Sequence, residues 1–163
     1  MKPTLIALLL LTSTAAPVAA HDFKIGTLEV KHPWSRVAPA AAPVLGGYVI
    51  IVNTGTESDR LIGGSAAVAA KFELHTSVIE DGVAKMRPAR DGIEIAPGQT
   101  VKLEPGGAHI MLVQPSARPA KGEKFAGTLV FEKAGTLNVE FAVQDAAPQP
   151  ASTSEHQGHV TTP

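Results

Sequence analysis

Short apolar runs recur along most of the chain, and polar turn signals separate them. The runs cover residues 26–30, 47–53, 60–64, 71–78, 83–87, 100–103, 109–113, 124–131 and 136–143. Gly, Pro, Asn and Asp gather between the runs, at residues 53–55, 81–82, 91–92, 97–98, 105–107 and 134–135. Many short strands joined by such turns predict a β-sandwich or a barrel.

The last run alternates as a half-buried strand does. Its odd positions from Leu137 to Val143 are apolar, and its even positions include the polar residues Asn138 and Glu140. Such alternation indicates one face in the core and one face in water. No helical pattern of useful length appears, because Pro39 and Pro43 interrupt the alanine-rich stretch at residues 38–42. We therefore predict an all-β domain over residues 21–145.

The two ends of the chain differ from the rest in composition. Residues 1–20 combine Lys2, an apolar run and a small-residue end at Ala20, which predicts a signal peptide cleaved after Ala20 and export to the periplasm. No later segment approaches the roughly 18 apolar residues of a membrane span, so we expect no membrane insertion. Residues 146–163 are rich in Pro, Gln, Ser and Thr, and we expect a disordered tail that carries His156 and His159.

Composition removes several classes of function. The sequence contains no cysteine, which excludes thiolate catalysis, iron–sulfur clusters and a blue-copper centre. After loss of Lys2, 13 basic residues remain against 15 acidic ones, and they are scattered, so nucleic acid is not an expected partner. No G-x-S-x-G nucleophile motif occurs, and we do not expect an enzyme.

Methionine is the most informative residue type, because only three occur and Met1 leaves with the signal peptide. A two-residue turn at Asp81-Gly82 would pair Ser77 with Met86 in a hairpin. His75 shares a strand face with Ser77, so His75 and Met86 become diagonal neighbours.

The second pair is His109 and Met111, two residues apart in a predicted strand and therefore on the same face. The two pairs could face each other if their strands are neighbours, which the sequence does not establish. Thioether sulfur selects Cu(I), and imidazole accepts copper in either oxidation state. An exposed, all-neutral set of such ligands suits a protein that must release its ion. The alternative is that the histidines are ordinary strand-end residues and the methionines fill the core.

At these residues the sequence resembles the periplasmic copper chaperone family PCuAC. The family signature runs His, ten residues, Met, about twenty-one residues, His, one residue, Met. Here the corresponding residues are His75, Met86, His109 and Met111, with one extra residue between Met86 and His109. Further similar segments are His32-Pro33-Trp34-Ser35-Arg36, Gly46-Gly47-Tyr48, Asn53-Thr54-Gly55, Glu73-Leu74-His75 and Phe131-Glu132-Lys133-Ala134-Gly135.

The resemblance implies a cupredoxin-like β-sandwich that binds Cu(I) through His75, Met86, His109 and Met111. It also implies copper delivery to the CuA centre in subunit II of cytochrome c oxidase, or exchange with a thiol-based copper chaperone. Family members tend to carry a tail that binds a second copper, for which His156 and His159 would be the ligands here.

Three further features of the sequence bear on the site. His21 would begin the mature chain, where its amine and imidazole could chelate Cu(II), although an exposed terminal histidine is the simpler interpretation. His32 beside Trp34 is interpreted as a packed strand edge and is left out of the site. Asp59 and Arg60 are expected to make a surface or turn contact.

Two other functions remain open at this point. One is a copper-buffering or copper-resistance protein. The other is an oxidative enzyme with a copper brace at His21, which lacks a third ligand at a plausible spacing.

Overall fold

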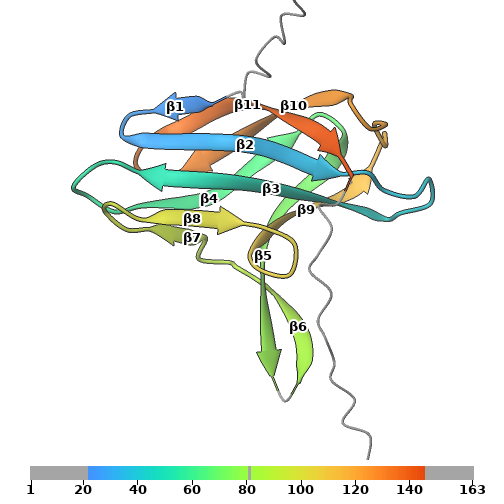
Figure 1. Cartoon of the computed structure of the whole chain (residues 1–163), viewed down its shortest axis with the longest axis horizontal. Helices are drawn as coiled ribbons and strands as arrows, with labels where there is room; N and C mark the ends of the chain where they lie inside the picture. The colour runs from blue at the N-terminus through green and yellow to red at the C-terminus, as the bar shows by residue number, and fades with distance from the viewer. Residues whose placement is uncertain (1–21, 81, 146–163) are drawn as a thin grey trace, which may run out of the picture.

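The computed structural model describes residues 22–80 and 82–145 (Figure 1). They form eleven β-strands in one sheet. The described residues contain no helix, and therefore none that could cross a membrane. The predicted signal peptide, His21 and the predicted tail lie outside the described residues. The strands are β1 (Phe23–Ile25), β2 (Leu28–Arg36), β3 (Val44–Asn53), β4 (Asp59–Ala66), β5 (Ala69–Glu80), β6 (Val83–Pro88), β7 (Ile93–Ile95), β8 (Thr100–Leu103), β9 (His109–Pro115), β10 (Lys124–Phe131) and β11 (Gly135–Gln144).

Every predicted apolar run corresponds to a strand, so the all-β prediction is confirmed. The sequence missed β1 and β7, which are only three residues long and too short to show alternation. Gly26, assigned to a strand in the prediction, instead lies in the turn between β1 and β2 with φ of 56°. Strand β2 continues through Pro33, where a bulge between Lys31 and Trp34 interrupts the pairing with β3.

The strands follow one continuous path of hydrogen-bonded neighbours. The order is β6-β5-β9-β3-β2-β11-β10-β4-β7, with β1 added beside β2 and β8 beside β3. Strand β11 runs parallel to β2, while the consecutive pairs such as β2–β3, β5–β6 and β10–β11 are antiparallel. The ends of the path, β6 and β7, are not paired with each other, so the sheet is open.

Alternating side chains from most strands fill the core. In β11, Val139, Phe141 and Val143 are buried, whereas Asn138 and Glu140 are exposed, as the alternation predicted. Burial of each such apolar side chain stabilises the fold by roughly 1.5–3 kcal/mol. The largest fully buried side chains are Phe131, Phe141, Leu28, Ile51, Leu61, Ile95, Leu103, Ile110, Leu112, Leu129, Val30 and Val49.

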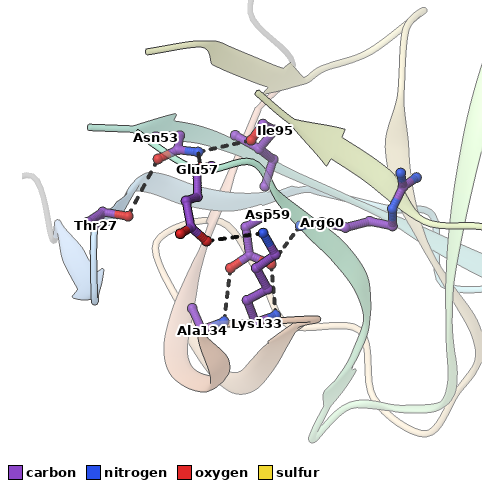
Figure 2. Close-up of polar contacts among 8 residues, drawn as sticks. All are labelled: Thr27, Asn53, Glu57, Asp59, Arg60, Ile95, Lys133 and Ala134. Carbon is purple, nitrogen blue, oxygen red and sulfur yellow. Dashed lines mark hydrogen bonds and ion pairs between the residues drawn. The ribbon is translucent and has the colours of Figure 1, made fainter. Parts of the chain in front are cut away.

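A buried amide ties the loop after β3 to two other segments (Figure 2). The Asn53 side chain donates to the carbonyl oxygens of Glu57 and Ile95 at 2.7 and 3.0 Å. Its own Oδ1 accepts from the backbone N–H of Gly55 at 2.9 Å. Asn53 therefore fixes the β3–β4 connection against the end of β7.

The carboxylate of Asp59 performs a similar task at the start of β4 (Figure 2). It accepts backbone N–H groups of Lys133 and Ala134, each at 2.9 Å, and that of Arg60 at 2.7 Å. Asp59 thus accepts hydrogen bonds from the backbone N–H groups of the turn between β10 and β11 and connects this turn to the start of β4. The expectation of a surface or turn contact is confirmed by this turn contact, which Asp59 makes from a buried position.

Candidate metal centre

The β5–β6 hairpin has the predicted register. Glu80 pairs with Val83 and Ser77 pairs with Met86. His75 lies two residues before Ser77 on the same face, so it is the diagonal neighbour of Met86, as expected. The hairpin projects away from the body of the sheet (Figure 1).

Strand β9 lies on the other side of β5 and supplies the second pair. His75 is directly opposite His109, and Glu73 is directly opposite Met111. Directly paired residues of antiparallel strands share a sheet face, so these four side chains lie on one face. The imidazole ring centroids of His75 and His109 are 5.9 Å apart, with planes inclined by 29°. The two predicted pairs are therefore neighbours, which the sequence left open.

The cluster formed by His75, Met86, His109 and Met111 is buried on one side and open on the other. His75 is 7% exposed, whereas Met86 on the edge strand β6 is 53% exposed. His109 and Met111 are half-buried between these extremes. A ligand held by all four side chains would be reached from the hairpin side.

The hydrogen bonds of the two imidazoles assign their protons. Nδ1 of His109 is 3.0 Å from the carbonyl oxygen of Gly107, which can only accept, so Nδ1 donates and, in the neutral imidazole, Nε2 carries the lone pair. Nε2 of His75 is 3.0 Å from Oε2 of Glu73. Nδ1 of His75 is buried and has no hydrogen-bond partner in the described structure. Such an unpaired atom costs about 1–3 kcal/mol, which a bound ligand could recover.

Glu73 is the residue that the sequence analysis missed. Its carboxylate contacts His75, one of the predicted ligands, without belonging to the predicted ligand set, which stays a prediction. The signal was present, since Glu73 and His75 are two apart in a strand and so share a face. Contact between them, however, depends on side-chain conformations that strand parity does not specify.

An aromatic pair borders the cluster beyond β9. Gly46 of β3 pairs with Met111, and the Tyr48 hydroxyl lies over Gly46, where a Cβ would be 2.4 Å from the hydroxyl oxygen. The Trp34 ring packs on Tyr48 with centroids 4.5 Å apart. Burial raises the pKa of Tyr48. The neighbouring His32 lies on β2, outside the cluster, with its ring centroid 6.5 Å from that of Trp34. The expectation of a packed strand edge is wrong, because His32 is exposed and β2 lies between β3 and β11 in the sheet.

The two faces of the hairpin differ in charge. On the face of His75 it presents Ser77, Met86 and Ile79, and Ile79 is 80% exposed. On the opposite face Glu80 forms ion pairs with Lys85 and Arg87. From His75 to the tip of the hairpin, this face is therefore uncharged, and Glu73 is the charged residue on the other side of His75.

The sequence between β2 and β11 identifies the family of this chain. A family model described as "Putative lipoprotein LpqE-like" matches residues 28–143, well over half of the chain. The chain belongs to the LpqE-like family. A relative of this LpqE-like protein, "Putative lipoprotein Lxx21020" of Leifsonia xyli subsp. xyli, is 32% identical over 118 residues, which are 72% of this chain and 70% of the relative.

Two solved structures resemble the LpqE-like chain closely in fold. The copper-bound PCuAC domain from PmoF2 has 30% sequence identity and a TM-score of 0.66, and the match covers 77% of this chain and 99% of that domain. Cu(I)-bound DR1885 from Deinococcus radiodurans has 22% identity and a TM-score of 0.60, covering 80% and 83% of the two chains, and it supports the fold alone. The PCuAC resemblance and the cupredoxin-like, single-domain fold are thereby confirmed.

Proposed function

We propose that this LpqE-like protein is an exported copper chaperone that binds one Cu(I) ion and passes it to an acceptor protein. The ligands of the proposed site are His75, Met86, His109 and Met111. The observation that carries the proposal is the register of β6, β5 and β9, which brings these four side chains to one face of three adjacent strands.

The donor set suits Cu(I) better than other common metal ions. Two thioethers are soft ligands, and the imidazoles of His75 and His109 each retain one nitrogen lone pair in the hydrogen-bond pattern described above. Zinc sites more often contain cysteine or carboxylate ligands. The copper-bound state of the similar PmoF2 domain supports the same cargo.

An open approach along the uncharged face of the hairpin tip supports transfer rather than permanent storage. Met86 is more than half exposed on an edge strand, so a second protein could contact a ligand of the bound ion directly. Copper storage would call for many soft ligands, and the sequence after residue 20 has two methionines and no cysteine. Copper buffering with the same site remains the second candidate.

The proposed compartment is the periplasm, and the proposed acceptor is another copper-binding protein. The PCuAC resemblance supports delivery to the CuA centre in subunit II of cytochrome c oxidase, or exchange with a thiol-based copper chaperone. The leader pattern at residues 1–20 and the lipoprotein description of the family support export to the periplasm. A second copper, bound as Cu(II) by His21, His156 and His159, remains a prediction on residues outside the described ones.

The test is an anaerobic Cu(I) titration of residues 21–163 against a chromophoric Cu(I) chelator. The Met86→Leu plus Met111→Leu variant keeps side-chain volume and removes both sulfur atoms. We expect one tight equivalent for the natural chain and its loss in the folded double variant. Equal binding by both proteins would refute the four-ligand site.

Two single histidine substitutions, one inside the cluster and one outside it, provide a matched comparison. His109→Asn removes a proposed ligand and should weaken Cu(I) binding. His32→Asn makes the same substitution outside the cluster, at φ of 50°, a conformation that Asn tolerates. Binding by His32→Asn should equal that of the natural chain. Transfer to an apo CuA domain then separates a chaperone from a buffer, because a buffer would retain the ion.

A further inference from the structure

The contact between Glu73 and His75 has no place in the four-ligand site, yet it involves one of the ligands. The Glu73 carboxylate lies 3.0 Å from Nε2 of His75, and the Glu73 side chain is 43% exposed while that of His75 is 10% exposed. Glu73 therefore lies at the boundary between solvent and the buried imidazole. Apart from His75, no ion-pair or hydrogen-bond partner is described for this carboxylate among residues 22–80 and 82–145.

Glu73 could in principle be a fifth ligand or a residue that acts on the ligand. Within the described residues, no three His, Cys, Asp or Glu side chains come together in a way that could hold a metal ion. Glu73, His75 and His109 therefore do not form a metal site by themselves. The carboxylate is instead engaged with a ring nitrogen of His75.

The two histidines share a common pattern of support. Each imidazole uses one ring nitrogen to donate to an oxygen of the protein: His109 to the Gly107 carbonyl, and His75 to the Glu73 carboxylate. Metal-binding histidines usually have such a partner, which fixes the tautomer and the ring orientation and makes the other nitrogen a better donor. The donating ring nitrogens differ: His109 donates through Nδ1, whereas His75 donates through Nε2.

We propose that Glu73 is a positioning residue that holds the Nε2–H of His75, so that His75 presents Nδ1 to copper while His109 presents Nε2. The unpaired, buried Nδ1 of His75 is the atom that this arrangement leaves available. The choice of copper as the ligand rests on the proposed function. The assignment of the two protons does not, because it concerns the metal-free protein.

The first test is a two-bond ¹H–¹⁵N correlation spectrum of the imidazoles of the metal-free, ¹⁵N-labelled chain at one neutral pH. His75→Asn and His109→Asn variants assign the two rings among the six histidines of the sequence. We expect opposite tautomers, with the proton on Nε2 in His75 and on Nδ1 in His109. On addition of Cu(I), the resonances of Nδ1 of His75 and Nε2 of His109 should move. Copper coordination through Nε2 of His75 would overturn the proposal.

The second test compares glutamate substitutions on strand β5. Glu73→Ala should weaken Cu(I) binding by about 10–100-fold, the usual effect of losing a hydrogen-bond partner of a metal ligand. Glu73→Gln should restore part of the loss, because its amide oxygen can still accept from Nε2. Glu80→Ala is the matched control, since it removes the same charge from the opposite face of the hairpin, where Glu80 contacts Lys85 and Arg87.

The outcomes separate this inference from the proposed function. If Glu73→Ala and Glu80→Ala bind Cu(I) as tightly as the natural chain and leave the His75 tautomer unchanged, the positioning role is refuted while the copper site stands. If the natural chain binds no Cu(I), the proposed function fails. The proton assignment for His75 is still tested by the metal-free spectra of the natural chain and of Glu73→Ala.

Discussion

Asp59 provides the most direct test of how this fold is held together, because its carboxylate is buried and fully engaged with backbone groups. In Asp59→Ala the N–H groups of Lys133 and Ala134 lose their acceptor, and the β10–β11 turn loses its connection to the start of β4. Hydrogen bonds to a charged group contribute about 1.5–3 kcal/mol each to stability. Water can reach part of the turn, so we expect a total loss of about 2–4 kcal/mol.

Urea unfolding followed by circular dichroism measures this loss. With a slope of about 2 kcal/mol per M for a domain of this size, the midpoint should fall by roughly 1–2 M. Glu57→Gln is the matched control, because Glu57 lies two residues before Asp59 and contacts the side chain of Lys133, but its side chain is 81% exposed. An exposed pair contributes little, so this variant should stay within about 0.5 kcal/mol of the natural chain.

Copper binding supplies an independent check on the same variant. Asp59 contacts the turn between β10 and β11, whereas the proposed ligands lie on β5, β6 and β9. Folded Asp59→Ala protein should therefore bind Cu(I) as tightly as the natural chain. A change in stability below about 0.5 kcal/mol would refute the stabilising role of the carboxylate.

Three other positions give further predictions. Gly46→Ala should displace the Tyr48 ring, since the new Cβ at residue 46 would lie 2.4 Å from the Tyr48 hydroxyl oxygen. The fluorescence of the single Trp should then change, and an unchanged spectrum and stability would contradict this packing. Burial raises the pKa of Tyr48 above 10.0, because the folded protein favours the neutral hydroxyl. The stability that this preference contributes is complete below pH 10.0 and is lost as the pH rises through the raised pKa. The unfolding free energy should therefore fall more steeply above pH 10.0 than in Tyr48→Phe, and parallel curves would refute the assignment. Ile79→Ser should change the free energy of unfolding by less than about 0.5 kcal/mol in a urea titration, because the side chain is 80% exposed; a larger loss would indicate packing of the hairpin tip.

The sequence predicted local features of the site better than distant ones. The pairing of Ser77 with Met86 follows from a two-residue turn, which fixes the register of both strands over a short distance. The pairing of His75 with His109 joins strands separated by β6, β7 and β8, and no local signal specifies it. Strand alternation predicted the buried face of β11, but not which strands surround it.

The missed features share one physical cause, since each depends on tertiary packing. The burial of Asp59 becomes visible only when the β10–β11 turn is placed against β4. The contact of Glu73 with His75 requires two particular side-chain conformations on a shared face. Strands β1 and β7 are recognisable only through their partners, β2 and β4.

The proposed ligands that would retain copper and the one that would exchange it lie on different strands. His75 and His109 lie on strands paired at both sides, and each imidazole already has a protein hydrogen-bond partner, so little freedom is lost when they bind an ion. Met86 lies on the edge strand of a projecting hairpin and is largely exposed. A thioether has no proton to exchange, so an incoming ligand can replace Met86 without disturbing the imidazoles. On this basis, copper would be retained by the interior strands and surrendered from the edge, as transfer between proteins requires.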